Sequence, residues 1–195
     1  MGHPVEEVGV ITFCYNVLSG GRCPIGWKVR TRAETDGSGL TVVSNTIACS
    51  GYLSQWTYQT ETSDGFKAIV WRLVIGSATS FKIVGINDIP GGESGRPVTF
   101  EVPTNDRIRV WPGDMIGWSF QGRGLRWSSG GGFNVRWVGG HLHSSLQAGQ
   151  TYNINGGSGY RMHTIGGTVE TIEGESCKIL FDMNAILFIL FCFTL

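Results

Sequence analysis

Charged residues are scarce in this chain of 195 residues, and their signs balance. Lys and Arg together number 15, Asp and Glu together also number 15, and the formal net charge at pH 7 is zero. A nucleic-acid-binding surface requires an excess of positive charge, and so does a surface that is held to anionic lipids. The composition therefore argues against a nucleic-acid partner and against general electrostatic attraction to a membrane.

Several short motifs that carry chemistry are also missing. The sequence contains no G-x-S-x-G motif, no phosphate-cradling glycine loop and no C-x-x-C spacing of the kind that zinc sites favour. It contains no N-x-[ST] glycosylation sequence either, which decides nothing about location. The absence of catalytic motifs predicts a protein that is not an enzyme and that needs no cofactor.

The two ends of the chain lack the signals that would give its location. Met1-Gly2-His3-Pro4 does not begin a signal peptide, because no basic segment followed by an apolar one is present. Residues 173–195 form an apolar tail that ends in AILFILFCFTL, which is too short to span a bilayer alone. Three interpretations of the tail are open: a GPI-type or membrane-inserting signal, a last core strand, or a misread gene end. We expect a fragment of a larger protein that meets a membrane, if at all, through this tail.

The region from Cys49 to Phe120 predicts short strands separated by tight turns. Tyr52 to Thr60 alternates with a period of two, typical of a half-buried strand, and Phe66 to Ile75 is apolar on both faces, typical of a central strand. No window shows a helical period. We therefore expect residues 1–172 to form one all-β domain, an antiparallel two-sheet β-sandwich of jelly-roll type, with residues 49–120 as its centre. The expected core residues are Trp56, Val70, Ile83, Ile108, Ile116, Trp118 and Phe120.

Turn signals separate these strands. Asp64-Gly65 is typical of a two-residue hairpin turn, so the strands on either side of it are expected to be antiparallel neighbours. Pro90-Gly91 and Pro112-Gly113 each suit the centre of a type II turn. Gly131-Gly132 suits another hairpin turn, with tryptophan and arginine on both sides of it. The cross-strand pairs expected there are Leu125–Val138, Arg126–Trp137 and Trp127–Arg136.

Two interpretations of these Trp–Arg pairs are open. Stacked pairs can fix the register of a hairpin and cover the sheet. They can equally form a binding ledge, since exposed tryptophan beside arginine and asparagine can stack on a sugar ring or anchor a protein partner. The candidate ligand-binding residues are Arg126, Trp127, Asn134, Arg136 and Trp137.

Histidines and aspartates provide weaker candidates for metal sites. His141 and His143 would share one face of a strand and His163 could approach from another, but the Glu that follows such a motif in metal-binding cupins is absent. A metal-dependent jelly-roll enzyme is therefore the less favoured alternative. Carboxylates in turns could gather Ca²⁺, although Asp is also simply a good turn residue. These carboxylates are Asp64, Asp88, Asp106 and Asp114.

The chain contains five cysteines, of which four are candidates for disulfides. In an oxidising compartment Cys14 and Cys23 could close a small loop, and Cys49 and Cys177 could tie the start of the core to its end. The alternative is that all the cysteines are reduced and buried.

Residues 49–120 resemble a β-sandwich module of large secreted and cell-surface proteins of invertebrates. The residues that carry the resemblance are Cys49-Ser50-Gly51, Trp56, Val70-Trp71-Arg72, Phe81-Lys82-Ile83-Val84-Gly85 and Pro112-Gly113-Asp114-Met115-Ile116-Gly117-Trp118. The resemblance implies an extracellular or cell-surface location and a role in recognition or adhesion, with an extracellular protein or a glycan as partner. It supplies no catalytic or ligand-binding residues.

Overall fold

The computed structural model describes residues 21–27, 34–35, 39–92, 95–122, 124–140, 143–172, 175–181 and 188–194. For residues 34–35, 130–131, 175–181 and 188–194 this description is of the backbone. Arg22–Thr171 form one compact unit, and the last two strands belong to a second unit, so each unit is described by itself.

The smaller sheet of the compact unit has five antiparallel strands in the order β1-β13-β4-β7. The fifth strand, β8, pairs with the first residues of β4, and β7 pairs with its last residues. Its strands are β1 (Arg22–Gly26), β4 (Gly51–Tyr58), β7 (Val98–Glu101), β8 (Ile108–Val110) and β13 (Ile165–Thr171). A short 3₁₀ helix, η1 (Thr104–Asp106), precedes β8.

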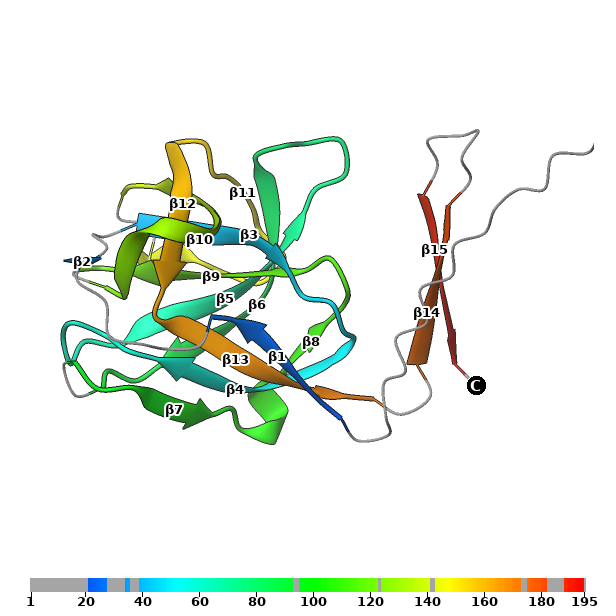
Figure 1. Cartoon of the computed structure of the whole chain (residues 1–195), viewed down its shortest axis with the longest axis horizontal. Helices are drawn as coiled ribbons and strands as arrows, with labels where there is room; N and C mark the ends of the chain where they lie inside the picture. The colour runs from blue at the N-terminus through cyan, green and yellow to red at the C-terminus, as the bar shows by residue number, and fades with distance from the viewer. Residues whose placement is uncertain are drawn as a thin grey trace, which may run out of the picture. The chain divides into compact units, whose positions relative to one another are not determined.

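The larger sheet has eight antiparallel strands in the order β11-β6-β5-β9-β3-β10-β12, with β2 paired to β10, and it forms a second layer (Figure 1). Its strands are β2 (Glu34–Thr35), β3 (Gly39–Thr46), β5 (Phe66–Leu73), β6 (Ser80–Ile89), β9 (Met115–Phe120), β10 (Arg126–Val138), β11 (Thr151–Asn153) and β12 (Gly157–His163). A second 3₁₀ helix is η2 (His143–Ser145). The prediction of an all-β, antiparallel two-sheet sandwich is confirmed. In the described part of the chain no helix has the length and apolar character that a membrane crossing requires.

The core between the two sheets contains most of the large buried side chains. All seven residues expected in the core are buried; six of them lie in this core, and Ile83 lies in a second cluster. A polar link joins the layers: Trp56 Nε1 on β4 donates to Asn87 Oδ1 on β6 at 2.9 Å, and Asn87 Nδ2 donates to the Asp106 carbonyl at 2.8 Å. Because both partners are buried or largely so, this link fixes how β4 lies against β6.

A second apolar cluster lies on the other face of the larger sheet. Ile69 and Trp71 of β5 and Ile83 of β6 are fully buried there, although the residues that alternate with them along these strands face the core between the sheets. The segment after η2 covers them, with Leu146 and Ile154 in the same cluster. This cover explains why the sequence of β5 is apolar on both faces.

Two of the three turn predictions made for residues 49–120 are wrong. β4 lies in the smaller sheet and β5 in the larger one, so Asp64-Gly65 joins two layers and not two paired strands. The chain leaves the smaller sheet before this turn, because Thr60 already pairs with Leu125, the residue that precedes β10 of the larger sheet. Gly91 lacks the positive φ of a type II turn, whereas Gly113 has a φ of 96°, as that turn requires.

The alternation along β4 reverses once. Trp56 and Tyr58 face the core as expected, but Tyr52 is 42% exposed and Leu53 is buried. On β13, Thr168 pairs with Gln55 and the next residue pairs with Leu53, so Ser54 is an extra residue in β4. Because of this β-bulge, the residues of β4 before Ser54 face the opposite way from the one that the alternation predicts.

Two strands at the C-terminal end of the chain pair with each other. β14 (Glu175–Phe181) and β15 (Phe188–Thr194) form an antiparallel two-stranded sheet in which Cys177 is the register partner of Cys192. They lie within the apolar tail that the composition separates from the sandwich.

Candidate functional site

The segment with the predicted ledge is one long strand and not a hairpin. β10 runs from Arg126 to Val138, and both of its halves pair with β12. Ser129 and Phe133 lie opposite the same residue, Arg161, so the glycines between them form a bulge. Gly132 has a φ of 86°, and a Cβ there would lie 2.4 Å from the Arg161 carbonyl oxygen. The expected cross-strand Trp–Arg pairs therefore do not form, because β12 provides a continuous partner for both halves.

The structure nevertheless brings the two tryptophans together. The guanidinium carbon of Arg161 lies 3.9 Å from the ring centroid of Trp127 and 4.1 Å from that of Trp137. All three side chains are partly exposed. We call this group the Trp–Arg–Trp stack. Its arginine comes from β12, and the sequence reasoning missed it because nothing in the local pattern of residues 157–163 indicates it.

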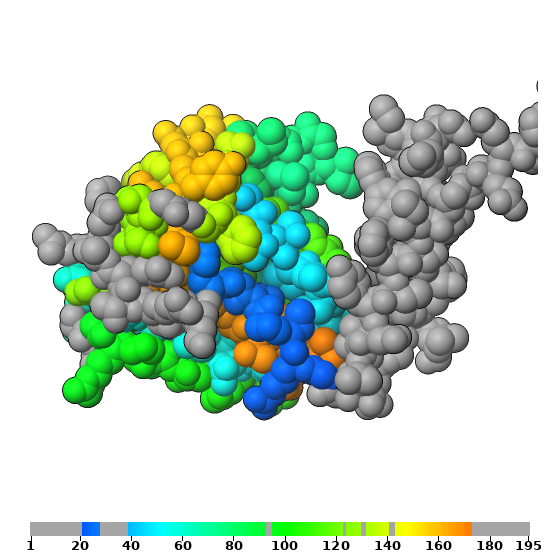
Figure 2. Space-filling model, viewed as in Figure 1, coloured from blue at the N-terminus to red at the C-terminus, as the bar shows by residue number. Residues whose placement is uncertain are grey.

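Two glycines of β12 make room for Trp137. A Cβ at Gly157 would lie 2.7 Å from the indole ring, and one at Gly159 would lie 3.6 Å from it. The ring also packs against the apolar core between the sheets. β10 and β12 lie side by side on the face shown in Figure 2, as yellow-green and yellow-to-orange atoms. Trp137 is therefore held in place by its surroundings before any ligand binds.

Beside the stack lies a buried aromatic cluster. His163 is fully buried, and its ring centroid lies 4.5 Å from that of Trp118, 5.8 Å from that of Trp27 and 6.3 Å from that of Trp127. Trp27 also contacts Phe133, with 5.3 Å between centroids. These rings connect one side of the stack to the core, so His163 supports Trp127 and does not face solvent.

The other candidate ligand-binding residues lie elsewhere. Arg126 Nη2 is paired with Glu61 Oε2 at 2.6 Å. Asn134 and Arg136 alternate with the core-facing residues of β10 and so lie on the opposite face of the sheet. There Asn134 is the register partner of Tyr160, which is 70% exposed. The predicted set of five is thus divided between two faces.

The two described histidines of the less favoured metal-site alternative, His143 and His163, do not lie together. His141 is outside the described residues. His143 Nδ1 lies 3.2 Å from Ser119 Oγ, whereas His163 contacts the ring of Trp118. Trp118 and Ser119 are consecutive in β9 and point to opposite faces, so His143 and His163 lie on opposite sides of the larger sheet. The described residues contain no group of three or more His, Cys, Asp or Glu that could hold a metal ion.

Two of the four turn carboxylates are paired with cations. Asp114 is 1% exposed and accepts two hydrogen bonds from Arg72, from Nε at 2.7 Å and from Nη2 at 2.9 Å. Hydrogen bonding to this carboxylate raises the pKa of Arg72. Asp88 is paired with Lys67. Both carboxylates therefore form ion pairs with side chains of β5.

One disulfide is present, with a pairing that differs from the expected one. Cys23 on β1 is bonded to Cys49, which precedes β4. Neither is therefore available to Cys14, which lies outside the described residues, or to Cys177. The sequence reasoning overlooked this pair because the two cysteines are 26 residues apart and become neighbours only when β1 and β4 join β13.

No protein-family model, no curated protein and no solved structure matches the chain. The β-sandwich that the resemblance implies is present in the structure, while these comparisons give no support to the invertebrate module itself.

Proposed function

We propose that the protein is a non-catalytic extracellular recognition module and that the Trp–Arg–Trp stack is its contact surface. The observation that carries this proposal is the convergence of Trp127, Arg161 and Trp137, all partly exposed, on one face of β10 and β12. Tryptophan and arginine are the residue types that most often dominate the binding energy of interfaces. Because the side chains of the stack are already held in place, binding would cost less of their conformational entropy.

The partner that fits this surface best is a protein that presents a carboxylate. The guanidinium of Arg161 places a positive charge within about 4 Å of both indole rings. A carboxylate is the group of opposite charge that arginine side chains recognise in proteins. The rings on either side would shield such a pair from water and so strengthen it.

A lectin-like site at Trp127 and Trp137 is the second candidate. Sugar rings stack on the open face of an aromatic side chain, but Arg161 covers one face of each indole here. Trp137 also has Gly157 directly against it. Stacking of a neutral sugar would require the guanidinium to move, and we therefore rank the acidic protein partner first.

The disulfide supports an extracellular location. Bonds such as Cys23–Cys49 persist in oxidising compartments and are rare in the cytosol. Recognition outside the cell is consistent with this bond.

Binding of the full chain to two arrays, one of extracellular protein domains and one of glycans, tests the proposal. We expect a protein ligand whose affinity falls on the order of 30-fold or more in Trp127→Ala and Trp137→Ala, as for central interface residues. Arg136→Ala, on the opposite face of the same strand, is the matched control and should bind normally. Raising the salt concentration should slow association.

Two results would count against this proposal. Equal loss in the control and in the stack variants would place the contact elsewhere. Binding to neutral glycans alone, lost in the stack variants, would support the lectin-like alternative.

A further inference from the structure

A polar pocket lies at the end of the larger sheet, and none of its lining residues belongs to the Trp–Arg–Trp stack. It has a volume of about 410 Å³, within the range of pockets that hold small ligands. Its lining comes from three places in the chain: the residues just before β5, the residues at and after the end of β9, and the start of η2. The lining residues are Asp64, Gly65, Phe120, Gln121, Gly122 and His143.

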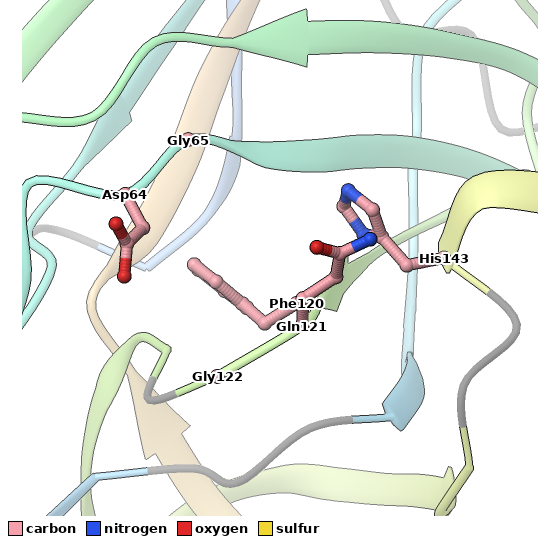
Figure 3. A pocket seen from close by; sticks show the side chains of 6 residues that line it. All are labelled: Asp64, Gly65, Phe120, Gln121, Gly122 and His143. Carbon is pink, nitrogen blue, oxygen red and sulfur yellow. The ribbon is translucent and has the colours of Figure 1, made fainter.

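The polar side chains of the pocket face it from two sides. In Figure 3 the Asp64 carboxylate lies at one end, and the Gln121 amide and the His143 imidazole lie at the other. β5 and β9 are antiparallel neighbours, and Lys67 is the register partner of Ser119, which brings the start of one strand beside the end of the other. The arrangement is therefore a consequence of the sheet and not of a flexible loop alone.

The orientation of His143 is set by a buried hydroxyl. Ser119, 1% exposed, holds Nδ1 at 3.2 Å, which leaves Nε2 for a ligand. Burial, and to a lesser degree the positive charge of Lys67, lowers the pKa of His143. The imidazole is then neutral at pH 7 and offers one donor and one acceptor in all.

The wall behind the polar groups is apolar and rigid. Phe120 is 2% exposed, and its ring is stacked on Phe66 with 4.7 Å between centroids. A Cβ at Gly124 would lie 2.6 Å from the Phe120 ring, so glycine is required on that side. Gly65 and Gly122 carry no side chain that would fill the space.

These groups select a ligand by their hydrogen-bonding capacity. The carboxylate of Asp64 only accepts and the amide of Gln121 donates and accepts, whereas Nε2 of the neutral His143 either donates or accepts, according to the tautomer. A hydroxyl group also donates and accepts, so hydroxyls on opposite sides of one small molecule can satisfy this mixture. An anionic ligand would instead meet the negative charge of Asp64. The pocket thus favours a small, neutral, hydroxyl-rich molecule.

We propose that this pocket binds one neutral sugar ring through hydroxyls on opposite sides of the ring, with Asp64 as acceptor at one end and Gln121 and His143 as partners at the other. The site is independent of the Trp–Arg–Trp stack, so either site can fail without the other. If both bind, the module recognises a glycan and an acidic protein surface at separate places.

Titration of the ¹⁵N-labelled full chain with sugars, followed by NMR, tests the proposal. The probes are glucose, galactose, mannose, N-acetylglucosamine and fucose, each as the free sugar and as its methyl glycoside. We expect at least one to produce saturable shifts at Gly65, Gln121 and Gly122, with a dissociation constant on the order of 1 mM, as is usual for a ligand this small. Binding of methyl glycosides indicates the terminal residue of a glycan, and binding of free sugars alone indicates a free-sugar site; both support the pocket.

Variants give the test its specificity. Asp64→Asn should weaken binding on the order of tenfold to a hundredfold, because a hydrogen bond to a charged group is lost while the shape is kept. Asp106→Asn, an exposed carboxylate outside the pocket, and Trp127→Ala should bind as the wild type does. Methyl glucuronide should bind more weakly than methyl glucoside, and Asp64→Asn should reduce that difference.

Three outcomes would overturn the proposal. They are the absence of saturable shifts with every probe, shifts centred on Trp127 and Trp137, and unchanged affinity in Asp64→Asn. The second of these would also show that any sugar binding belongs to the stack and not to the pocket.

Discussion

At the scale of single residues, the candidate site depends on a contact between distant parts of the chain. Trp127 and Trp137 stand out in the sequence because they lie on either side of a run of glycines, each next to an arginine. Their partner, Arg161, could not be identified in this way, because cross-strand neighbours depend on register and β12 lies more than twenty residues further on. The residue types of the site were predictable, and their geometry was not.

The buried link between Trp56 and Asn87 makes a prediction about stability. Trp56→Phe keeps a ring in the core but leaves Asn87 Oδ1 without the indole donor. We expect the free energy of unfolding to fall by about 1–3 kcal/mol, the cost of an unsatisfied buried polar group, with a further loss from the smaller ring. Urea denaturation measures this, and Trp111→Phe at a partly exposed position is the control. A similar loss in both variants would contradict the role of the link.

The lowered pKa of His143 predicts how stability depends on pH. Above the unfolded-state pKa of about 6.5, His143 is neutral in both states and has no effect. As the pH falls below that value, the unfolded state takes up the proton first, so folding stability is lost on acidification. His143→Gln should therefore lose less free energy of unfolding than the wild type between about pH 7.5 and about pH 5.5. The groups that act on the imidazole are Lys67, Asp88 and Ser119. Equal losses in the two proteins would show that His143 does not titrate as argued.

At the scale of strands, alternation predicted the elements better than their connections. β4, β5 and β9 lie where the pattern of apolar residues places them. The two hairpins assigned to Asp64-Gly65 and Gly131-Gly132 are wrong, because a turn-like dipeptide shows where a chain can bend but not which strand it meets next. One of these dipeptides spans two layers and the other interrupts a single strand.

The bulge in β10 makes a prediction that separates backbone strain from crowding. Gly132 and Gly76 have similar positive φ values, 86° and 80°, but a Cβ at Gly76 would meet nothing within 4 Å. Gly76→Ala should cost about 1 kcal/mol of stability from backbone strain alone. Gly132→Ala should cost more, since its Cβ meets the Arg161 carbonyl, and thermal denaturation compares the two. Equal costs would mean that the bulge adapts to a side chain.

At the scale of the whole molecule, the sandwich and its core residues were predictable from the sequence. The cover over the outer face of the larger sheet was not, although the two apolar faces of β5 indicated that one was needed. The disulfide was expected with the wrong partners, because chain separation says nothing about which strands become neighbours. Both errors concern contacts between elements and not the elements themselves.

The disulfide should contribute a large part of the stability of the sandwich. It closes a segment of 26 residues, which corresponds to about 3.5 kcal/mol in the chain-entropy model. The double variant Cys23→Ser/Cys49→Ser should lose up to about that free energy of unfolding, measured by denaturation without a reducing agent. Adding a reducing agent should then have no further effect on the variant. An unchanged stability of the variant would show that the bond does not form in solution.

Photo-cross-linking from the two faces of β10 and β12 tests the proposed recognition surface most directly. A photoreactive residue at Ser129 lies opposite Arg161, beside the Trp–Arg–Trp stack, and one at Tyr160 lies on the other face of the same strand pair. Our account predicts that the full chain, applied to intact cells, is cross-linked to a surface protein from position 129 and not from position 160. Cross-linking from position 160 alone, or equally from both positions, would contradict it.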